Sequence, residues 1–372
     1  LVQQRRASKK WSTSGFNPSL SVLIAAYNEE KVIEKTLQSV LTTTYSGDIS
    51  VWVVDDGSSD KTAGIVEAFS RKDHRVRLIR QANQGKALAL RNGLASIADD
   101  IVVMLDADTR FQPETLMRLV QPLQDKNVAA VSGHAKVGNL RSFMARCQAL
   151  EYICGFNLDR RAYHHLNCIT VVPGAISAVR KNAVLQAGGI STDTLAEDTD
   201  LTLSLHREGF RIAYVSDALA FTEAPETIAT LAKQRFRWAF GTIQCLWKHR
   251  DMVLNTRFKA LGCFSLPGIW FFQVLLVAIA PVIDALVIFS LFLGKSSPSL
   301  YAYFGIFLLM DFLLAAMACM MEHEPVRRAW LILPMRFVYR PMLSWVIWKS
   351  LIKAAKGALV SWGKLERTAS VT

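Results

Sequence analysis

Between residues 20 and 133, short apolar runs rich in β-branched residues alternate with longer segments whose apolar positions recur at helical spacing. The apolar runs predict strands at residues 21–26, 49–55, 76–80, 101–106 and 128–132. The segments between them predict helices at residues 29–41, 61–71, 85–98 and 113–124. Strands that alternate with helices at this spacing indicate right-handed crossovers, so we expect an α/β fold with a mostly parallel sheet.

After residue 135 the pattern is less regular. A helical stretch at residues 140–161 precedes a strand at residues 171–179, which Pro173-Gly174 interrupts. Two further helices are predicted at residues 197–209 and from about residue 225 to residue 248.

Two long apolar stretches follow, residues 266–293 with one charge at Asp284 and residues 300–321 with one charge at Asp311. Because about 20 apolar residues span a bilayer, both predict membrane helices, joined by a short connector. A buried soluble hairpin would need a much larger core around it. The two aspartates could face a polar channel, lie near a helix end or pair within the bundle.

A third apolar stretch, residues 329–352, contains Arg336 and Arg340. Arginine near the middle of a bilayer is costly, so an interfacial or re-entrant helix is favoured over a third span. The expected organisation is a basic segment (1–19), an α/β domain (20–250), interfacial and transmembrane helices (251–360) and a basic tail (361–372). The basic tail indicates a cytoplasmic end, while segment 1–19 is either a solvated tail or a cytoplasmic segment beside a membrane helix that precedes it.

Composition narrows the function class. Hydrophobic residues make up 51% of the chain, which excludes a disordered protein, and its 20 Gly and 6 Cys exclude a collagen or a disulfide scaffold. The scattered cysteines lack zinc-site spacing and fit a reducing compartment. A net charge of +12 favours an anionic partner, either nucleic acid or an anionic membrane. Because the sequence begins with Leu1 rather than Met, we expect it to be part of a longer chain.

Ligands of such sheets bind at the carboxyl ends of the strands. Asp106 and Asp108 follow one strand, and in extended backbone residues i and i+2 point the same way, so they could bind Mg²⁺ or Mn²⁺ with positions left for phosphate oxygens. Asp55 and Asp56 follow an earlier strand and could accept hydrogen bonds from a base or ribose. Both sites could also be ordinary turns, and Ser58, Ser59 or Asp60 could cap the helix that follows Asp55-Asp56. The sequence has no glycine-rich dinucleotide motif and no P-loop.

Two later motifs lie on predicted helices. Glu197 and Asp198 open one of them, where the helix dipole favours acids and would keep a general base ionised at neutral pH. Gln234, Arg237 and Trp238 are spaced i, i+3, i+4 on the next and share one face. Arg237 can hold a diphosphate and Trp238 can support a sugar ring, or the helix can lie on a membrane surface.

In this order, the segments Tyr27-Asn28-Glu29, Asp55-Asp56, Asp106-Ala107-Asp108, Glu197-Asp198 and Gln234-Arg235-Phe236-Arg237-Trp238 resemble the motifs of family 2 processive glycosyltransferases. This is the family of cellulose, chitin, hyaluronan and poly-N-acetylglucosamine synthases. The resemblance covers roughly residues 20–250 and the membrane hairpin. It implies a GT-A fold, a multi-pass protein of the inner (plasma) membrane with a cytoplasmic catalytic domain, and inverting transfer from a UDP-sugar to a growing polysaccharide.

The resemblance also implies residue roles. The uridine side of the donor would be held by Tyr27, Glu29, Asp55 and Asp56. The sugar diphosphate would be bound by Lys86, Asp106, Gln234 and Arg237, and its Mg²⁺ or Mn²⁺ by Asp106 and Asp108.

For the acceptor, the resemblance implies that Asp198 of the Glu197-Asp198 pair is the catalytic base and that Trp238, Gly174 and Ala175 form the binding site. Pro173-Gly174-Ala175 is similar to the loop of amino-sugar polymerases and differs from the Phe-Cys-rich loop of cellulose synthases. Residues 195–209 are similar to the poly-N-acetylglucosamine and chitin-oligosaccharide branch. Both favour UDP-GlcNAc.

Two departures from the family pattern bear on partners. The family usually carries membrane helices before the catalytic domain, and we expect that such helices were removed here or that an accessory membrane subunit supplies them. We do not expect the cyclic-nucleotide-binding barrel of the cellulose branch.

Three other classes stay open. A non-processive family 2 enzyme that glycosylates a lipid carrier would not need the motif from Gln234 to Trp238. A nucleic-acid-binding protein is disfavoured by the clustered acids and by the membrane helices, so nucleic acid is not expected as a partner. The third is a transporter or scaffold with a degenerate nucleotide domain.

Overall fold

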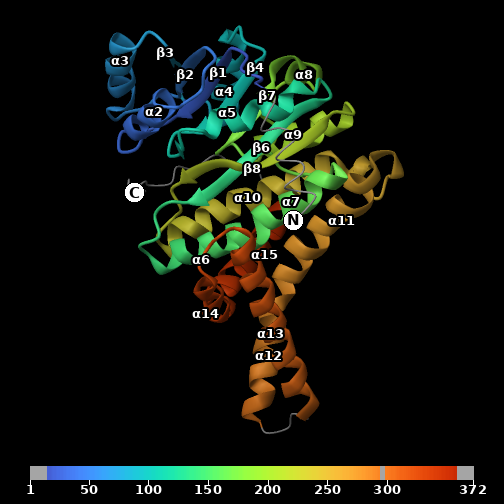
Figure 1. Cartoon of the computed structure of the whole chain (residues 1–372). Helices are drawn as coiled ribbons and strands as arrows, with labels where there is room; N and C mark the ends of the chain where they lie inside the picture. Colours follow the sequence, from blue (N-terminus) through green and yellow to red (C-terminus); the bar gives the residue numbers. More distant parts are fainter. Residues whose placement is uncertain (1–14, 294–297, 358–372) are drawn as a thin grey trace.

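The computed structural model describes residues 15–293 and 298–357. An α/β domain lies at one end, and long C-terminal helices extend from it as a stalk (Figure 1). The predicted basic tail at residues 361–372, most of the basic segment at 1–19 and most of the connector between the two apolar stretches lie outside the described residues.

One sheet of eight strands, in the order β3-β2-β1-β4-β7-β6-β8-β5, forms the centre of the domain. The strands are β1 (Leu20–Ala26), β2 (Ile49–Asp55), β3 (Val76–Arg80), β4 (Ile101–Asp106), β5 (Arg110–Phe111), β6 (Val128–Val137), β7 (Ser177–Arg180) and β8 (Arg211–Thr222). Strands β1 to β4 are parallel to their neighbours among themselves, and β6 is parallel to β8. The remaining pairs, which involve β7 and β5, are antiparallel. The predicted α/β fold with a mostly parallel sheet is confirmed.

The strand predictions are confirmed for β1 to β4, and β6 runs five residues beyond its predicted end, to Val137. The prediction at residues 171–179 is wrong in its first half. Residues before Ser177 form a turn in which the Ile176 N–H donates to the Pro173 carbonyl at 3.3 Å. Proline lacks the N–H that a ladder needs, so the strand begins after it. The sequence pattern missed β8, whose pairing with β6 is interrupted by register shifts.

Helices cover both faces of the sheet. The helices are α2 (Ile33–Leu41), α3 (Thr62–Lys72), α4 (Lys86–Ser96), α5 (Thr115–Val120), α8 (Lys181–Gln186) and α9 (Glu197–Arg207). Val22 and Ile24 of β1 pack in one core cluster with Leu37 of α2, while Leu23 packs in a second cluster with Leu94 of α4. Alternate residues of a strand point to opposite faces, so two cores form around one sheet. The predicted helix at 113–124 changes to a 3₁₀ turn at Gln121–Gln124, which contains Pro122.

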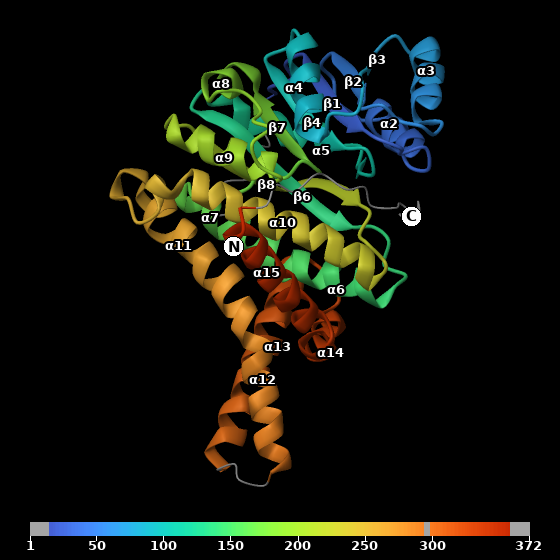
Figure 2. The ribbon, with the colours of Figure 1, turned by 180° about the vertical axis from the view of Figure 1, so that it is seen from behind.

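A helical layer lies between the sheet and the stalk (Figures 1 and 2). It contains α6 (Phe143–Glu151), a π-helical stretch (Tyr152–Asn157), α7 (Leu158–Leu166) and α10 (Ile228–Lys248). The prediction of a helix at 140–161 is confirmed, with the π-helical insertion as an addition. Helix α10 begins later than the predicted Pro225, because Thr227 and Thr230 form a capping box at its N-terminus.

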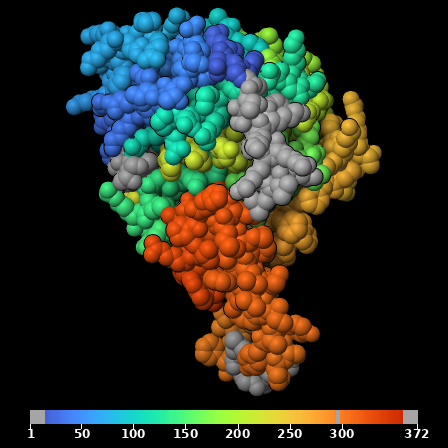
Figure 3. All heavy atoms as spheres, in the orientation of Figure 1, coloured from blue at the N-terminus to red at the C-terminus, as the bar shows by residue number. Residues whose placement is uncertain are grey.

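The stalk projects from the rest of the molecule (Figure 3). It contains two helices that are long and apolar enough to cross a membrane. The first, Leu261–Ser290, includes two π-helical stretches, α11 (Leu266–Gly268) and most of α12 (Leu276–Phe292); the second is α13 (Pro298–Met321). Only 17% and 22% of their most apolar windows are buried. A core helix of a soluble domain would hide most of such a window, so the exposure fits an apolar environment around the stalk.

The third apolar stretch consists of a 3₁₀ turn (Val326–Leu331), α14 (Ile332–Phe337) and α15 (Tyr339–Ala355). Helix α15 packs against α10 and α12. Arg336 forms an ion pair with Asp284 and lies 3.2 Å from Asp311, which also lies 2.9 Å from Arg340. Of the alternatives for the two aspartates, the structure shows pairing within the bundle. Whether the segment spans or re-enters the bilayer stays a prediction.

Candidate active site

The carboxyl ends of β1, β2 and β4 meet at one edge of the sheet. In the parallel register, Ala26 of β1 lies opposite Asp55 of β2, and Ala25 lies opposite Asp106 of β4. The segments that begin at Tyr27, Asp55 and Asp106 are therefore side by side, as the strand pattern predicts.

Asn28 joins the loop after β1 to the loop after β2. Its φ is 54°, in the left-handed region that asparagine adopts more readily than most residues. Its N–H donates to Ser58 Oγ at 2.8 Å, and its Oδ1 accepts from the N–H of Ser59 at 2.7 Å. The N–H of Glu29 donates to Thr62 Oγ1 at 2.7 Å. No role was expected for Asn28, but these bonds hold the half-buried Tyr27 and Glu29 at the edge of the sheet.

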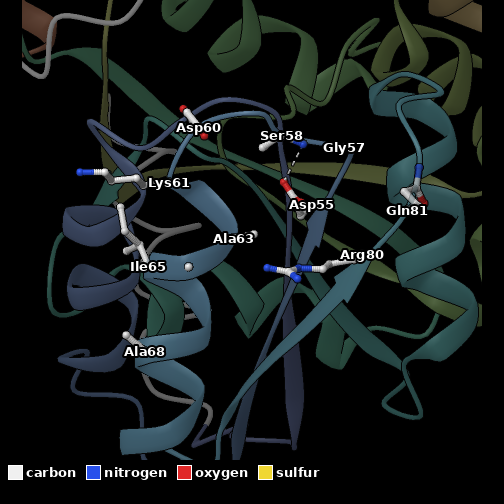
Figure 4. Close-up of a pocket in the computed structure, with 11 residues that line it drawn as sticks. Asp55, Gly57, Ser58, Asp60, Lys61, Ala63, Ile65, Ala68, Arg80 and Gln81 are labelled. Carbon is white, nitrogen blue, oxygen red and sulfur yellow. Dashed lines mark hydrogen bonds between the residues drawn. The ribbon is translucent and has the colours of Figure 1, made fainter.

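Asp55 lies beside an open hollow of about 720 Å³ between α3 and the ends of β2 and β3 (Figure 4). Its Oδ1 accepts a hydrogen bond from the N–H of Ser58 at 3.2 Å. Arg80 and Gln81 line the same hollow, whereas Lys86 and Asp106 do not. The hollow thus adjoins the predicted uridine side and is separate from the acid cluster described below.

Asp56 is buried, and its carboxylate is engaged by the loop that precedes α4. It accepts from Gln81 Nε2 at 2.7 Å, from the N–H of Gln84 at 3.0 Å and from the N–H of Gly85 at 2.8 Å. Gly85 has a φ of 93°, which suits glycine, and the chain then enters α4 at Lys86. Asp56 therefore positions Lys86, and a direct contact of Asp56 with uridine stays a prediction.

Lys86 joins two acids that are far apart in the sequence. Its Nζ lies 2.8 Å from Asp106 Oδ1 at the end of β4 and 3.1 Å from Glu197 Oε1 at the start of α9. Burial alone would lower the pKa of Lys86, but the charges of Asp106 and Glu197 outweigh it and raise that pKa above its usual value. The ammonium is therefore charged at any physiological pH.

Gly174 lies directly against this ion-pair cluster. A Cβ at position 174 would be 2.7 Å from Lys86 Nζ and 3.3 Å from Asp106 Oδ1, so any larger side chain would displace the ammonium. Ala175 follows in the turn that leads to β7 and is half-buried. The predicted acceptor loop and the predicted donor residues thus meet at Lys86.

Asp198 lies beside Glu197 at the first turn of α9. It lines a small hollow of about 20 Å³ together with apolar side chains such as Leu201 and Leu205. Burial, followed by the charge of Glu197, raises the pKa of Asp198 to about 6. The shift is opposite to the one expected from the helix dipole, because desolvation dominates. With this pKa the carboxylate is still ionised by about ten to one at pH 7.

Polar contacts fix the first half of α9 to its neighbours. Asp200 lies 2.7 Å from His249 Nε2 and 2.8 Å from Lys248 Nζ, which attaches α9 to the end of α10. Thr202 Oγ1 donates to the Asp198 carbonyl at 2.6 Å and accepts from the N–H of Val172 at 2.9 Å. These contacts hold the loop before β7 and the acid pair in one arrangement.

The helix α10 brings Gln234 and Arg237 toward the same region. A Cβ at Gly241 would lie 2.8 Å from Ala196 Cβ, so α10 touches α9 at the residue just before Glu197. Arg237 is one turn earlier on the same face as Gly241. Gln234 is buried, and its Oε1 accepts no hydrogen bond from the part of the chain that the structure describes. Such an orphaned acceptor is expected where a ligand or water is missing.

Arg235, to which no role was assigned from the sequence, attaches α10 to the layer below. It forms an ion pair with Glu151 and donates to Tyr339 Oη at 3.2 Å. Its guanidinium lies 4.3 Å from the ring centroid of Trp238, and the ring of Phe156 meets Trp238 edge-on at 5.9 Å. Trp238 is partly exposed, and its role as a support for a sugar ring stays a prediction.

Asp108 lies in a turn after β4, so the expectation that Asp106 and Asp108 point the same way from extended backbone is wrong in its premise. Asp108 is buried, and its Oδ1 accepts from Thr222 Oγ1 at 3.4 Å. Within residues 15–293 and 298–357, no three His, Cys, Asp or Glu side chains form a group that could hold a metal ion. Two carboxylates are hard oxygen donors, and they fit a divalent ion only if diphosphate oxygens and water complete its shell.

Comparison with known proteins identifies the family. The family model described as "Glycosyltransferase like family 2" matches residues 18–241. This stretch includes Lys86 with its partners Asp106 and Glu197, and the helix that carries Gln234 and Arg237. The chain belongs to glycosyltransferase family 2.

Two relatives of this glycosyltransferase are poly-beta-1,6-N-acetyl-D-glucosamine synthases. The one from Staphylococcus aureus (strain COL) is 30% identical over 239 residues, which cover 64% of this chain and 58% of the relative. The one from Staphylococcus epidermidis is 31% identical over 249 residues, which cover 66% of this chain and 60% of the relative. The match thus spans less than two thirds of the length of each relative.

Among solved structures, the mannosyltransferase PcManGT from Pyrobaculum calidifontis, in complex with GDP-Man and Mn²⁺, superposes with a TM-score of 0.65. The two chains are 21% identical, and the superposition covers 95% of this chain and 94% of that one. The similarity shows a shared fold, and the predicted GT-A fold is confirmed.

Proposed function

We propose that this glycosyltransferase transfers N-acetylglucosamine from UDP-GlcNAc to the growing end of a β-linked polysaccharide, with inversion at the anomeric carbon. The observation that carries the proposal is the bridge from Lys86 to Asp106 and Glu197, with Gly174 packed against it. Through this bridge, the Lys86 ammonium contacts both the end of β4, where the donor is proposed to bind, and the start of α9, where the acceptor is proposed to bind. The similarity to poly-beta-1,6-N-acetyl-D-glucosamine synthases supports the choice of sugar.

On the donor side, Tyr27, Glu29 and Asp55 bind the uridine, and Asp56 acts through the loop to Lys86. Gln234 and Arg237 bind the diphosphate, for which a guanidinium is suited by its two parallel donors. Asp106 and Asp108 would hold Mg²⁺ or Mn²⁺, which neutralises charge on the leaving diphosphate.

On the acceptor side, Asp198 takes the proton of the attacking hydroxyl, and Trp238 supports the sugar ring beside Gly174 and Ala175. Glu197 holds the Lys86 ammonium and raises the basicity of Asp198. A single displacement from the face opposite UDP converts the α-linked donor into a β-linked product.

We also propose that the stalk spans the inner (plasma) membrane and that the catalytic domain lies on the cytoplasmic side. Where the stalk joins the domain, the exposed residues include Trp330, Trp345 and Trp348, and Lys349 lies 5.0 Å from the ring of Trp345. Tryptophan and lysine are enriched at membrane interfaces. A complete polysaccharide channel would need further helices, from an accessory membrane subunit or another part of the protein.

The test is nucleotide release from a panel of donors. Membranes that contain the protein are incubated with UDP-GlcNAc, UDP-glucose, UDP-glucuronic acid and GDP-mannose, with Mg²⁺ or Mn²⁺. We expect UDP release from UDP-GlcNAc and a polymer on a gel. Release from no donor, or from GDP-mannose alone, would reject the proposal, and a product of one sugar on a lipid would identify a lipid-carrier glycosyltransferase instead.

A further inference from the structure

Arg160 of α7 is a buried arginine outside the set of residues assigned above. Only 7% of it is exposed, and its buried Nε has no hydrogen-bond partner among the residues that the structure describes. Its closest defined contact is the ring of Phe156, whose centroid is 5.9 Å from the guanidinium carbon. A buried N–H donor without an acceptor is unfavourable, because it has given up its hydrogen bond to water without a replacement.

Two neighbouring arginines have carboxylate partners. Arg161 lies 2.7 Å from a carboxylate oxygen of Glu322, and Arg235 is paired with Glu151. Arg161 and Arg235 thus each have a carboxylate in ion-pair contact. The buried Nε of Arg160 has no acceptor from the described residues, which makes it a candidate contact for a ligand.

Tyr214 of β8 presents a second unfilled group at the same place. It is also 7% exposed, and its hydroxyl has no hydrogen-bond partner among the described residues. Helix α7 packs on β8 here, because His164 Nδ1 accepts from the Tyr214 N–H at 3.2 Å. Arg160 is one turn before His164 on the same face of α7. Its guanidinium and the Tyr214 phenol lie close enough for each to act on the pKa of the other.

The two groups lie between the proposed base and the proposed sugar platform. Burial lowers the pKa of Arg160, and Tyr214, Tyr152, Asp198 and Asp159 oppose that shift, so these four groups are near enough to act on its charge. On the other side, Phe156 lies under Arg160 and meets Trp238 at 5.9 Å. Polar donors beside an aromatic face are what a sugar ring needs: hydroxyl oxygens accept the hydrogen bonds, and the apolar face stacks.

We propose that Arg160 and Tyr214 form a subsite that binds oxygen atoms of the acceptor saccharide and holds its terminal ring against the Phe156–Trp238 pair, next to Asp198. The proposal rests on the proposed function and adds two acceptor-binding residues to it. In the proposed function the donor lies on the Asp106 side of Lys86, so a loss of the subsite should weaken acceptor binding and leave donor binding unchanged.

The experiment compares Arg160→Gln and Tyr214→Phe with Arg146→Gln, a matched control because Arg146 is exposed on α6 of the same helical layer. The acceptor is a soluble β-1,6-linked N-acetylglucosamine oligosaccharide. We expect the acceptor KM to rise about 10- to 100-fold in Arg160→Gln, and less in Tyr214→Phe, as for the loss of a charged and a neutral hydrogen bond. The KM for UDP-GlcNAc and the slow hydrolysis of UDP-GlcNAc without acceptor should stay within about twofold of wild type.

An unchanged acceptor KM, or an equal rise in both KM values, would overturn the subsite. Tyr214→Phe keeps the ring and its packing, so it still reports if Arg160→Gln does not fold. A second measurement, direct binding of the oligosaccharide followed by tryptophan fluorescence, separates the two proposals. If the wild type turns over no donor, the proposed function fails. If the oligosaccharide binds equally to wild type and Arg160→Gln, or to neither, the subsite is rejected.

Discussion

The position of Gly174 gives the sharpest test of the Lys86 cluster. In Gly174→Ala the new Cβ would start 2.7 Å from Lys86 Nζ. An ordinary contact needs about 3.4 Å or more, so the ammonium must move by roughly 0.7 Å. The end of a lysine side chain can do this without unfolding the domain, but its 2.8 Å and 3.1 Å contacts with Asp106 and Glu197 cannot both survive.

Because displacement of a catalytic group by about 1 Å can reduce rates by about 10²-fold, we expect kcat/KM for UDP-GlcNAc to fall 10- to 100-fold. The assay is the initial rate of UDP release at several donor concentrations, with thermal unfolding as the measure of stability. The matched control is Gly305→Ala on α13, where a Cβ meets nothing within 4 Å. It should keep wild-type activity.

A double-mutant cycle tests whether the alanine acts through the ammonium. In Lys86→Met the target of the clash is no longer charged, so adding Gly174→Ala should lower activity by less than about threefold. Two effects that multiply in full would show that Gly174 acts independently of Lys86. Wild-type kcat/KM in Gly174→Ala, or a loss that only follows unfolding, would refute the reasoning.

Three further outcomes follow from the same geometry. Asp198→Asn should keep UDP binding, measured by titration, and lose transfer by about 10²–10⁴-fold. A base must be ionised and the pKa of Asp198 is raised to about 6, so wild-type kcat should fall as the pH drops below about 6. A rate that does not change from pH 5 to pH 8 would contradict that role. Asp56→Ala removes the acceptor of three hydrogen bonds, so the free energy of unfolding should fall by about 3 kcal/mol in denaturant titrations, and an unchanged midpoint would argue against a positioning role. Chelation by EDTA should stop UDP release until Mn²⁺ or Mg²⁺ is restored, and Asp108→Asn should raise the ion concentration required; full activity in EDTA would exclude the proposed ion site.

The local elements were predictable because their signals are local. The apolar runs of β1 to β4 and the amphipathic pattern of α9 and α10 lie within single segments, and the structure has these elements within a few residues of the predicted bounds. Failures occurred where pairing with a distant segment decides the outcome. Strand β8 exists because β6 pairs with it despite the register shifts. The backbone turns at Asp108, where the Thr36 hydroxyl, 71 residues away in the sequence, donates to the Ala107 carbonyl at 2.7 Å.

The order of the motifs also predicted the family and the region of the site, since parallel strands must present their carboxyl ends at one edge. The partners of each charged side chain were not predictable. The contacts of Asp56 and Asp284 depend on which atoms the rest of the chain brings within about 3 Å. The sequence does not tell whether Asp56 contacts uridine or the loop before Lys86, or whether Asp284 faces a channel or Arg336.

The sequence alone determined the α/β architecture, the stalk of apolar helices and the list of acids that could bind a nucleotide-sugar. It could do so because hydrophobic periodicity and position at the end of a strand are properties of short stretches. Tertiary structure alone decided that Lys86 lies between Asp106 and Glu197, that Gly174 leaves no room beside it, and that Asp198 is desolvated enough to hold its pKa near 6. Pair distances and desolvation are set by packing between segments far apart in the chain, and no local pattern encodes them.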